Sequence, residues 1–160
     1  MRHVKWLAVL VAVLATTAFA NTYFVQMATV RGGTNAKGPV CVSNTVFQPG
    51  EAVVWQAYVY DAVTGARVTA GEIKNRGIEL HVTLSDGKDI KMDYGAHPPS
   101  APAASQEHFW TGAWDIPTDV ATGTYNWTLT VTDNAGHKDT FTPIGQGVGL
   151  NQLTVAKPQG

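Results

Sequence analysis

Three side chains that suit a soft metal flank a proline-rich stretch in the second half of the chain. Met92 and His97 precede the prolines, and His108 follows them. Thioether sulfur and imidazole nitrogen are ligands that copper accepts in proteins. If the strands on either side pair, these side chains meet at one end of the domain, and the sequence then predicts a copper site. The alternative is that Met92 is a core residue and His97 a solvated loop residue.

Aromatic and proline side chains gather around the same stretch, which runs from Gly95 to Glu107. Aromatic faces stack on sugar rings or pack against protein partners. The side chains expected at such a surface are Tyr94, His97, Pro98, Pro99, Trp110 and Trp114. Trp110 and Trp114 share one side of a strand and Phe109 takes the other, so one set must be core. Two interpretations stay open: a carbohydrate-binding module that uses Trp110 and Trp114, and a module that contacts a partner protein through residues 95–107.

The short motifs of catalysis are missing from the sequence. It contains no H-E-x-x-H, no G-x-S-x-G, and no glycine-rich phosphate loop before a helix. It also lacks a run of lysine and arginine that could neutralise nucleic-acid phosphates. We therefore expect a protein that is not an enzyme, needs no cofactor unless copper binds, and recognises another envelope or secreted protein rather than nucleic acid.

The first twenty residues have the pattern of a secretory signal peptide. Arg2 and Lys5 give a basic start, an apolar stretch follows, and Ala18 and Ala20 form a small-x-small cleavage site. The pattern predicts cleavage after Ala20, a periplasmic or secreted protein, and no membrane span in the mature chain. The single cysteine, Cys41, excludes an internal disulfide, and its apolar neighbours predict that it is buried.

Short strands are the elements that must position these residues. Apolar and polar residues alternate with a period of two along several segments, and turn residues separate them. The expected strands lie at 23–30, 40–47, 51–60, 78–84, 89–94, 108–115, 123–132, 138–141 and within 147–156. No segment after the signal peptide has a helical period, and no element is assigned to 67–77. About eight or nine such strands indicate an all-β fold, an antiparallel sandwich or small barrel.

Two segments resemble bacterial immunoglobulin-like domains. Residues 117–136 carry a G-x-Y start, alternating threonine and valine, and a D-x-x-G turn, and residues 47–65 end in a similar turn. The resemblance implies an immunoglobulin-like antiparallel β-sandwich, with Tyr125 at the tyrosine-corner position and Trp55 as the buried tryptophan. The other residues expected in the core are Trp127, Leu129 and Val131.

The predicted organisation follows from these segments. Residues 1–20 form the signal peptide, 21–46 the N-terminal strands and a linker, and 47–160 the immunoglobulin-like domain. Residues 21–160 are expected to fold as one globular unit.

Overall fold

The fold of the chain is all-β, which confirms that expectation. The computed structural model describes residues 21–100, 102–142 and 151–157. The elements in these ranges are β1 (Tyr23–Arg31), β2 (Val46–Phe47), β3 (Ala52–Asp61), α2 (Ala70–Arg76), β4 (Glu79–Leu84), β5 (Asp89–His97), the 3-10 turn η1 (Ala103–Ser105), β6 (Glu107–Asp115), β7 (Gly123–Thr132), β8 (Lys138–Phe141) and β9 (Gln152–Val155). The predicted signal peptide and the predicted strand residues Val148 and Leu150 lie outside the described ranges.

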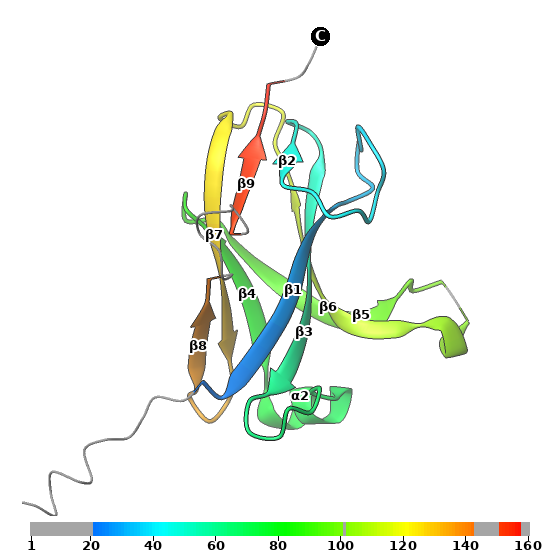
Figure 1. Ribbon diagram of the computed structural model, residues 1–160, viewed down its shortest axis with the longest axis vertical. Helices are drawn as coiled ribbons and strands as arrows, with labels where there is room; N and C mark the ends of the chain where they lie inside the picture. The colour runs from blue at the N-terminus through cyan, green and yellow to red at the C-terminus, as the bar shows by residue number, and fades with distance from the viewer. Residues whose placement is uncertain (1–20, 101, 143–150, 158–160) are drawn as a thin grey trace, which may run out of the picture.

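The nine strands form one mixed sheet that curls into a nearly closed barrel (Figure 1). Their order is β1-β3-β6-β5-β4-β7-β9-β2, and β8 pairs with β7. Every named strand pair is antiparallel except β2 and β9, which are parallel. The expected purely antiparallel sheet is therefore wrong. The parallel pair joins two segments far apart in the chain, and such a crossover leaves no local turn signal in the sequence.

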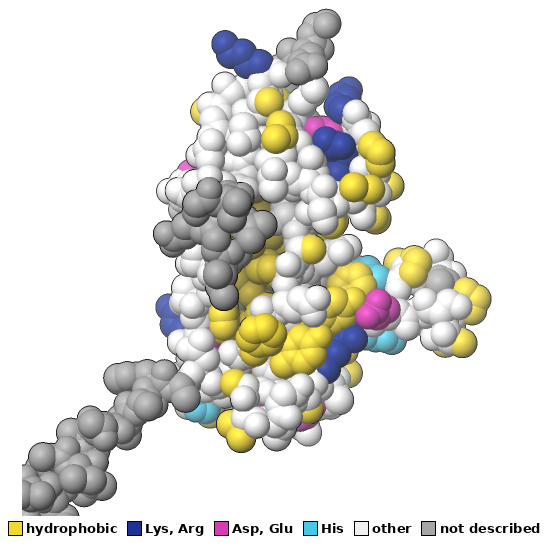
Figure 2. Space-filling model, viewed as in Figure 1, with side chains coloured by type: hydrophobic (Ala, Val, Ile, Leu, Met, Phe, Trp, Pro, Cys, Tyr) yellow, Lys and Arg dark blue, Asp and Glu magenta, His cyan; other side chains and the backbone are white. Residues whose placement is uncertain are grey.

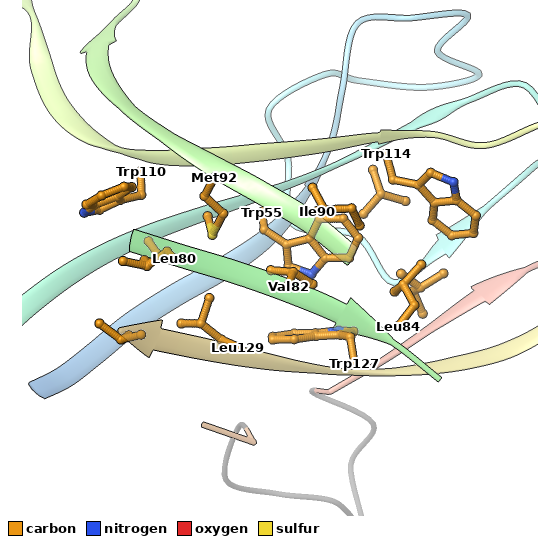
Figure 3. Close-up of a cluster of buried hydrophobic side chains, with 14 of the residues drawn as sticks. Trp55, Leu80, Val82, Leu84, Ile90, Met92, Trp110, Trp114, Trp127 and Leu129 are labelled. Atoms are coloured by element: carbon orange, nitrogen blue, oxygen red, sulfur yellow. The ribbon is translucent and has the colours of Figure 1, made fainter. Parts of the chain in front are cut away.

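The interior of the barrel is filled by large apolar side chains (Figure 3). Trp55 and Trp127 meet edge to face, with ring centroids 6.2 Å apart. Leu129 and Val131 of β7 are fully buried beside them. Gly112 allows β5 to pack closely, because a Cβ at that position would lie 2.9 Å from Cγ of Met92.

Tyr125 ties the start of β7 to the loop before it. Its hydroxyl donates a hydrogen bond to the carbonyl of Ala121 over 2.7 Å. The half-buried ring packs edge-on against Trp114, with centroids 5.5 Å apart. A tyrosine that bonds back to backbone a few residues upstream has the geometry of a tyrosine corner.

The short helix α2 was not predicted. Thr69 caps its N-terminus: its hydroxyl accepts from the N–H of Glu72, and the Glu72 carboxylate accepts from the N–H of Thr69. Gly77 ends the helix in the left-handed conformation, with φ 59°. Seven residues are too few to display a helical period, but the T-x-x-E capping box was present in the sequence. None of the described helices is long and apolar enough to cross a membrane.

The segment around Cys41 differs from its prediction. The expected strand over 40–47 is reduced to Val46–Phe47, and Cys41 is exposed rather than buried. Cys41 has φ 57°, which interrupts an extended chain, and Val40 and Val42 are about half exposed. The apolar alternation therefore runs through a turn, which is bonded by its main chain to the edge of β1 at Thr29 and Arg31.

The β5–β6 hairpin is longer than predicted and projects from the barrel as an arm (Figure 1). β5 continues to His97 and β6 begins at Glu107, so that His97 and Glu107 are paired. The connection between them is therefore 98–106, shorter than the 95–107 stretch expected from the sequence. The arm carries Pro98 and Pro99 at its exposed tip.

Candidate functional site

A row of aromatic side chains crosses four neighbouring strands on the outer face of the sheet. The row consists of Phe24 on β1, Tyr60 and Tyr58 on β3, Phe109 on β6 and His97 on β5, and we call it the outer aromatic strip. These residues alternate along their strands with the residues that face the core, so they point away from the barrel interior. Figure 2 shows apolar side chains gathered on this face, up to the base of the arm.

The rings of the strip contact one another across the strands. Phe24 and Tyr60 are direct partners in the β1–β3 ladder, with ring centroids 6.0 Å apart. Tyr58 and Phe109 lie 5.4 Å apart, and the imidazole of His97 stacks on Phe109 at 4.3 Å. Such cross-strand aromatic pairs fix each other's rotamers and hold the surface rigid.

A charged pair borders the strip. The guanidinium of Arg67 lies over the Tyr58 ring, 4.2 Å from its centroid, and its Nη1 lies 3.6 Å from the carboxylate of Glu107. Burial, followed by hydrogen bonding to Glu107, raises the pKa of Tyr58, so its phenol stays neutral near pH 7. The combination of tyrosine, phenylalanine and arginine is typical of the centre of protein interfaces.

His97 connects the strip to a polar groove of about 550 Å³ on the same face. Gln56, Asp93 and Thr111 line the groove beside it, and Nε2 of His97 lies 3.5 Å from the Thr111 hydroxyl. Burial, and then the neighbouring His108, lower the pKa of His97. A neutral imidazole at pH 7 can both stack on Phe109 and exchange hydrogen bonds with a ligand.

The three residues predicted as copper ligands are not brought together. Met92 is fully buried among core side chains. His108 is exposed on the same side of the hairpin but about 13 Å farther along it, at the strand rise of about 3.3 Å per residue. His97 points to the opposite face, and the described residues hold no group of three or more His, Cys, Asp and Glu side chains placed to bind a metal. The geometry therefore gives the copper interpretation no support.

The predicted aromatic surface is divided between the two faces of the hairpin. Trp110 and Trp114 are 5% and 4% exposed and pack in the core, so neither offers a face to a sugar ring. Tyr94 is half-buried against Trp110, with centroids 5.5 Å apart. Of the expected surface residues, His97 lies in the outer aromatic strip, and Pro98 and Pro99 lie on the arm beyond it.

Sequence reasoning missed Phe24, Tyr58 and Tyr60 as surface residues. The signal was nevertheless present, because Tyr58 and Tyr60 make the second side of β3 almost as apolar as the first. In a sheet with one face on the core, the other face is normally polar. A strand that is apolar on both sides therefore indicates either a second buried face or an exposed binding surface.

A scan against protein-family models finds no match for this chain, and a search of curated proteins finds no similar sequence.

Proposed function

We propose that the protein is a non-catalytic binding module that contacts a partner protein through the outer aromatic strip and the β5–β6 arm. The observation that carries the proposal is the strip itself, a row of contacting rings on the outer face of the sheet, in which Phe109 is buried, Tyr58, Tyr60 and His97 are half-buried and Phe24 is exposed. Phe24 is 60% exposed there, although burying such a ring would be favourable by about 2 kcal/mol. Exposed apolar surface of this kind typically marks an interaction site.

The shape of the strip favours a protein over a sugar. Phe24 and Tyr60 are tilted by 50° and Tyr58 and Phe109 by 54°, so the rings do not present one flat platform for a chain of sugar rings. Tilted rings with Arg67 and Glu107 beside them suit an irregular protein surface with its own polar groups.

We further propose that the module is an immunoglobulin-like domain of a periplasmic or secreted protein, and that its partner is another envelope or secreted protein. The hydrogen bond from Tyr125 to Ala121 supports the kinship, because it reproduces the tyrosine corner that the resemblance implies. The location rests on the signal-peptide pattern of residues 1–20.

Site-specific photocrosslinking tests the partner surface. With p-benzoylphenylalanine in place of Phe24 in the native host, we expect a discrete crosslinked species with one other protein. The matched control carries the same group in place of Asp86, an exposed residue in the β4–β5 turn. We expect the additional substitution Tyr58→Ala to reduce the crosslink at least about tenfold, since hot-spot aromatic residues contribute about 2 kcal/mol or more to binding.

Two results of the crosslinking experiment would contradict the proposal. If the probes at positions 24 and 86 give the same products, or if Tyr58→Ala leaves the crosslink unchanged in a normally folded protein, the strip is not the partner surface. Circular dichroism of the Tyr58→Ala protein provides the check on folding.

A further inference from the structure

We propose that the free edge of β1, at Val25 and Met27, is a strand-addition site that takes a short extended segment of another protein. The proposal goes beyond the outer aromatic strip, because it rests on the main-chain groups of β1 rather than on aromatic side chains. It would survive if the strip proved to have no partner.

The hydrogen-bond register of β1 shows which of its groups are free. On the two sides of β1, the carbonyl of Thr22 accepts a hydrogen bond from the N–H of Ala62, just after β3, and the N–H of Gly32 donates to the carbonyl of Ala52, the first residue of β3. The register between them is continuous, so the even-numbered residues of β1 bond to β3 and the odd-numbered residues point away from it. Main-chain partners of Val25 and Met27 on this outer edge are absent from the described part of the chain. Each residue thus offers one N–H and one C=O to an incoming strand.

Both ends of this edge are closed. At the start of β1, the N–H groups of Thr22 and Tyr23 donate to the carboxylate of Asp139 on β8, over 2.8 and 3.0 Å. At the other end, the carbonyl of Thr29 accepts from the N–H of Asn44 over 3.1 Å. Native sheets normally protect a long edge strand from pairing. Here the protection covers the two ends of β1. Between them, the described residues leave a window of about five residues, 24–28, without a partner on this edge.

The window opens onto a groove of about 390 Å³. Met27, Thr29, Asn44 and Trp127 are among the residues that line it. Trp127 is 2% exposed, and its indole N–H has no acceptor in the described part of the chain. The indole N–H groups of Trp55 and Trp114 also lack acceptors in the described part of the chain, so an unpaired indole is not special to this groove. A strand laid along β1 would bring carbonyl groups and alternate side chains to this groove.

The closed ends also favour a short peptide segment over a second copy of the chain. Two β1 strands pairing antiparallel about Gln26 would set Tyr23 of one copy against Thr29 of the other. The carbonyl of Thr29 is already bonded to Asn44, and the chain around Asn44 occupies the space beside it. A segment of about five extended residues fits between the ends without this collision. Its alternate side chains would be apolar, because Val25 and Met27 pack against the core on the inner side.

Amide hydrogen exchange measured by NMR on the purified protein tests the first part of the proposal. The amides of Val25 and Met27 should exchange about 100-fold faster than those of Gln26 and Ala28, which bond to β3. Protection of Val25 and Met27 at every protein concentration would show that the protein covers its own edge. Protection that grows with protein concentration would show pairing between copies. Either result would overturn the proposal.

The second part uses the capped peptide Lys-Thr-Val-Thr-Val-Thr-Lys as the probe. Main-chain bonds supply most of the affinity in strand addition, so we expect this peptide at about 1 mM to protect Val25 and Met27. Val25→Pro, which removes an outward N–H and leaves the β3 ladder intact, should weaken binding about tenfold, whereas Val25→Ala should not. No protection by the peptide, or equal binding by the two variants, would overturn the proposal.

If Val25→Pro fails to fold, the same test is made by changing the peptide instead of the protein. Two forms of the peptide are N-methylated at alternate amides, so that one form loses the donors that face β1 and the other loses the donors that face away. We expect one form to lose binding about tenfold and the other to retain it. Equal effects of the two forms would contradict main-chain pairing.

Discussion

Replacing Glu51 by alanine is expected to destabilise the protein by about 3–5 kcal/mol, the usual range for removing one partner of a buried ion pair. The Glu51 side chain is 1% exposed, and its Oε1 lies 3.0 Å from Nε of Arg31. The two carboxylate oxygens also accept hydrogen bonds from the N–H groups of Lys37 and Gln48, each over 2.7 Å. One side chain thus holds the long connection after β1 against the start of β3.

The cost is large because Nε of Arg31 is a buried atom and would stay so without the carboxylate. Nε of Arg31 lies close to Glu51 without the alignment of a hydrogen bond, so its contact with Glu51 is an ion pair. Without the carboxylate, this charge and the N–H groups of Lys37 and Gln48 lose their partner together. Glu51→Gln should be intermediate, because it keeps the volume but turns an amide donor toward other donors.

Urea unfolding followed by tryptophan fluorescence measures this effect. The matched control is Glu79→Ala, which removes an exposed ion pair with Lys91 and should cost less than about 1 kcal/mol. A loss below 1 kcal/mol for Glu51→Ala would show that water replaces the carboxylate, and that the connection is not held by it.

The second large effect is expected at Asp133, whose substitution by asparagine should cost about 2 kcal/mol at pH 7. The Asp133 side chain is 2% exposed. Burial by itself raises its pKa, but hydrogen bonds from the Tyr23 hydroxyl, at 2.6 Å, from the His137 side chain and from the N–H groups of His137 and Ala135 outweigh burial. The pKa of Asp133 is therefore lowered to about 2.

The sign of the pH dependence follows from this lowered pKa. A carboxylate that titrates near 3.9 when unfolded and near 2 when folded stabilises the protein fully above pH 4, and loses that stabilisation as the pH falls to 2. We therefore expect the stability difference between the wild type and Asp133→Asn to shrink from about 2 kcal/mol at pH 7 toward zero near pH 2.

Urea midpoints at several pH values between 7 and 2 test this expectation. Taking the difference between the two proteins removes the contributions of carboxylates that share no partner with Asp133, among them Glu79, whose pKa is also lowered, chiefly by the hydrogen bond from Lys91. Tyr23→Phe is the companion variant, since it keeps the carboxylate and removes one of its donors. Parallel stability curves for the wild type and Asp133→Asn would contradict the lowered pKa.

The candidate site was predicted in part from the sequence. Of the residues expected at the surface, Pro98 and Pro99 are exposed on the arm, and His97 is half-buried against Phe109. Trp110 and Trp114 were expected either at a surface or in the core, and alternation alone does not decide which side of a strand faces inward. In the folded sheet both indoles face the core, and Phe109 lies on the opposite face, where it packs against Tyr58 and His97.

The sequence by itself determined the all-β class, most strand positions and the turns, because alternation and turn chemistry act between near neighbours. Only the tertiary structure decided that β2 pairs in parallel with β9, that Phe24 meets Tyr60, and that the outward main-chain groups of Val25 and Met27 have no partner among the described residues. These features depend on contacts between segments distant in the chain. Their registers are selected by the burial of one common core, which no single segment encodes.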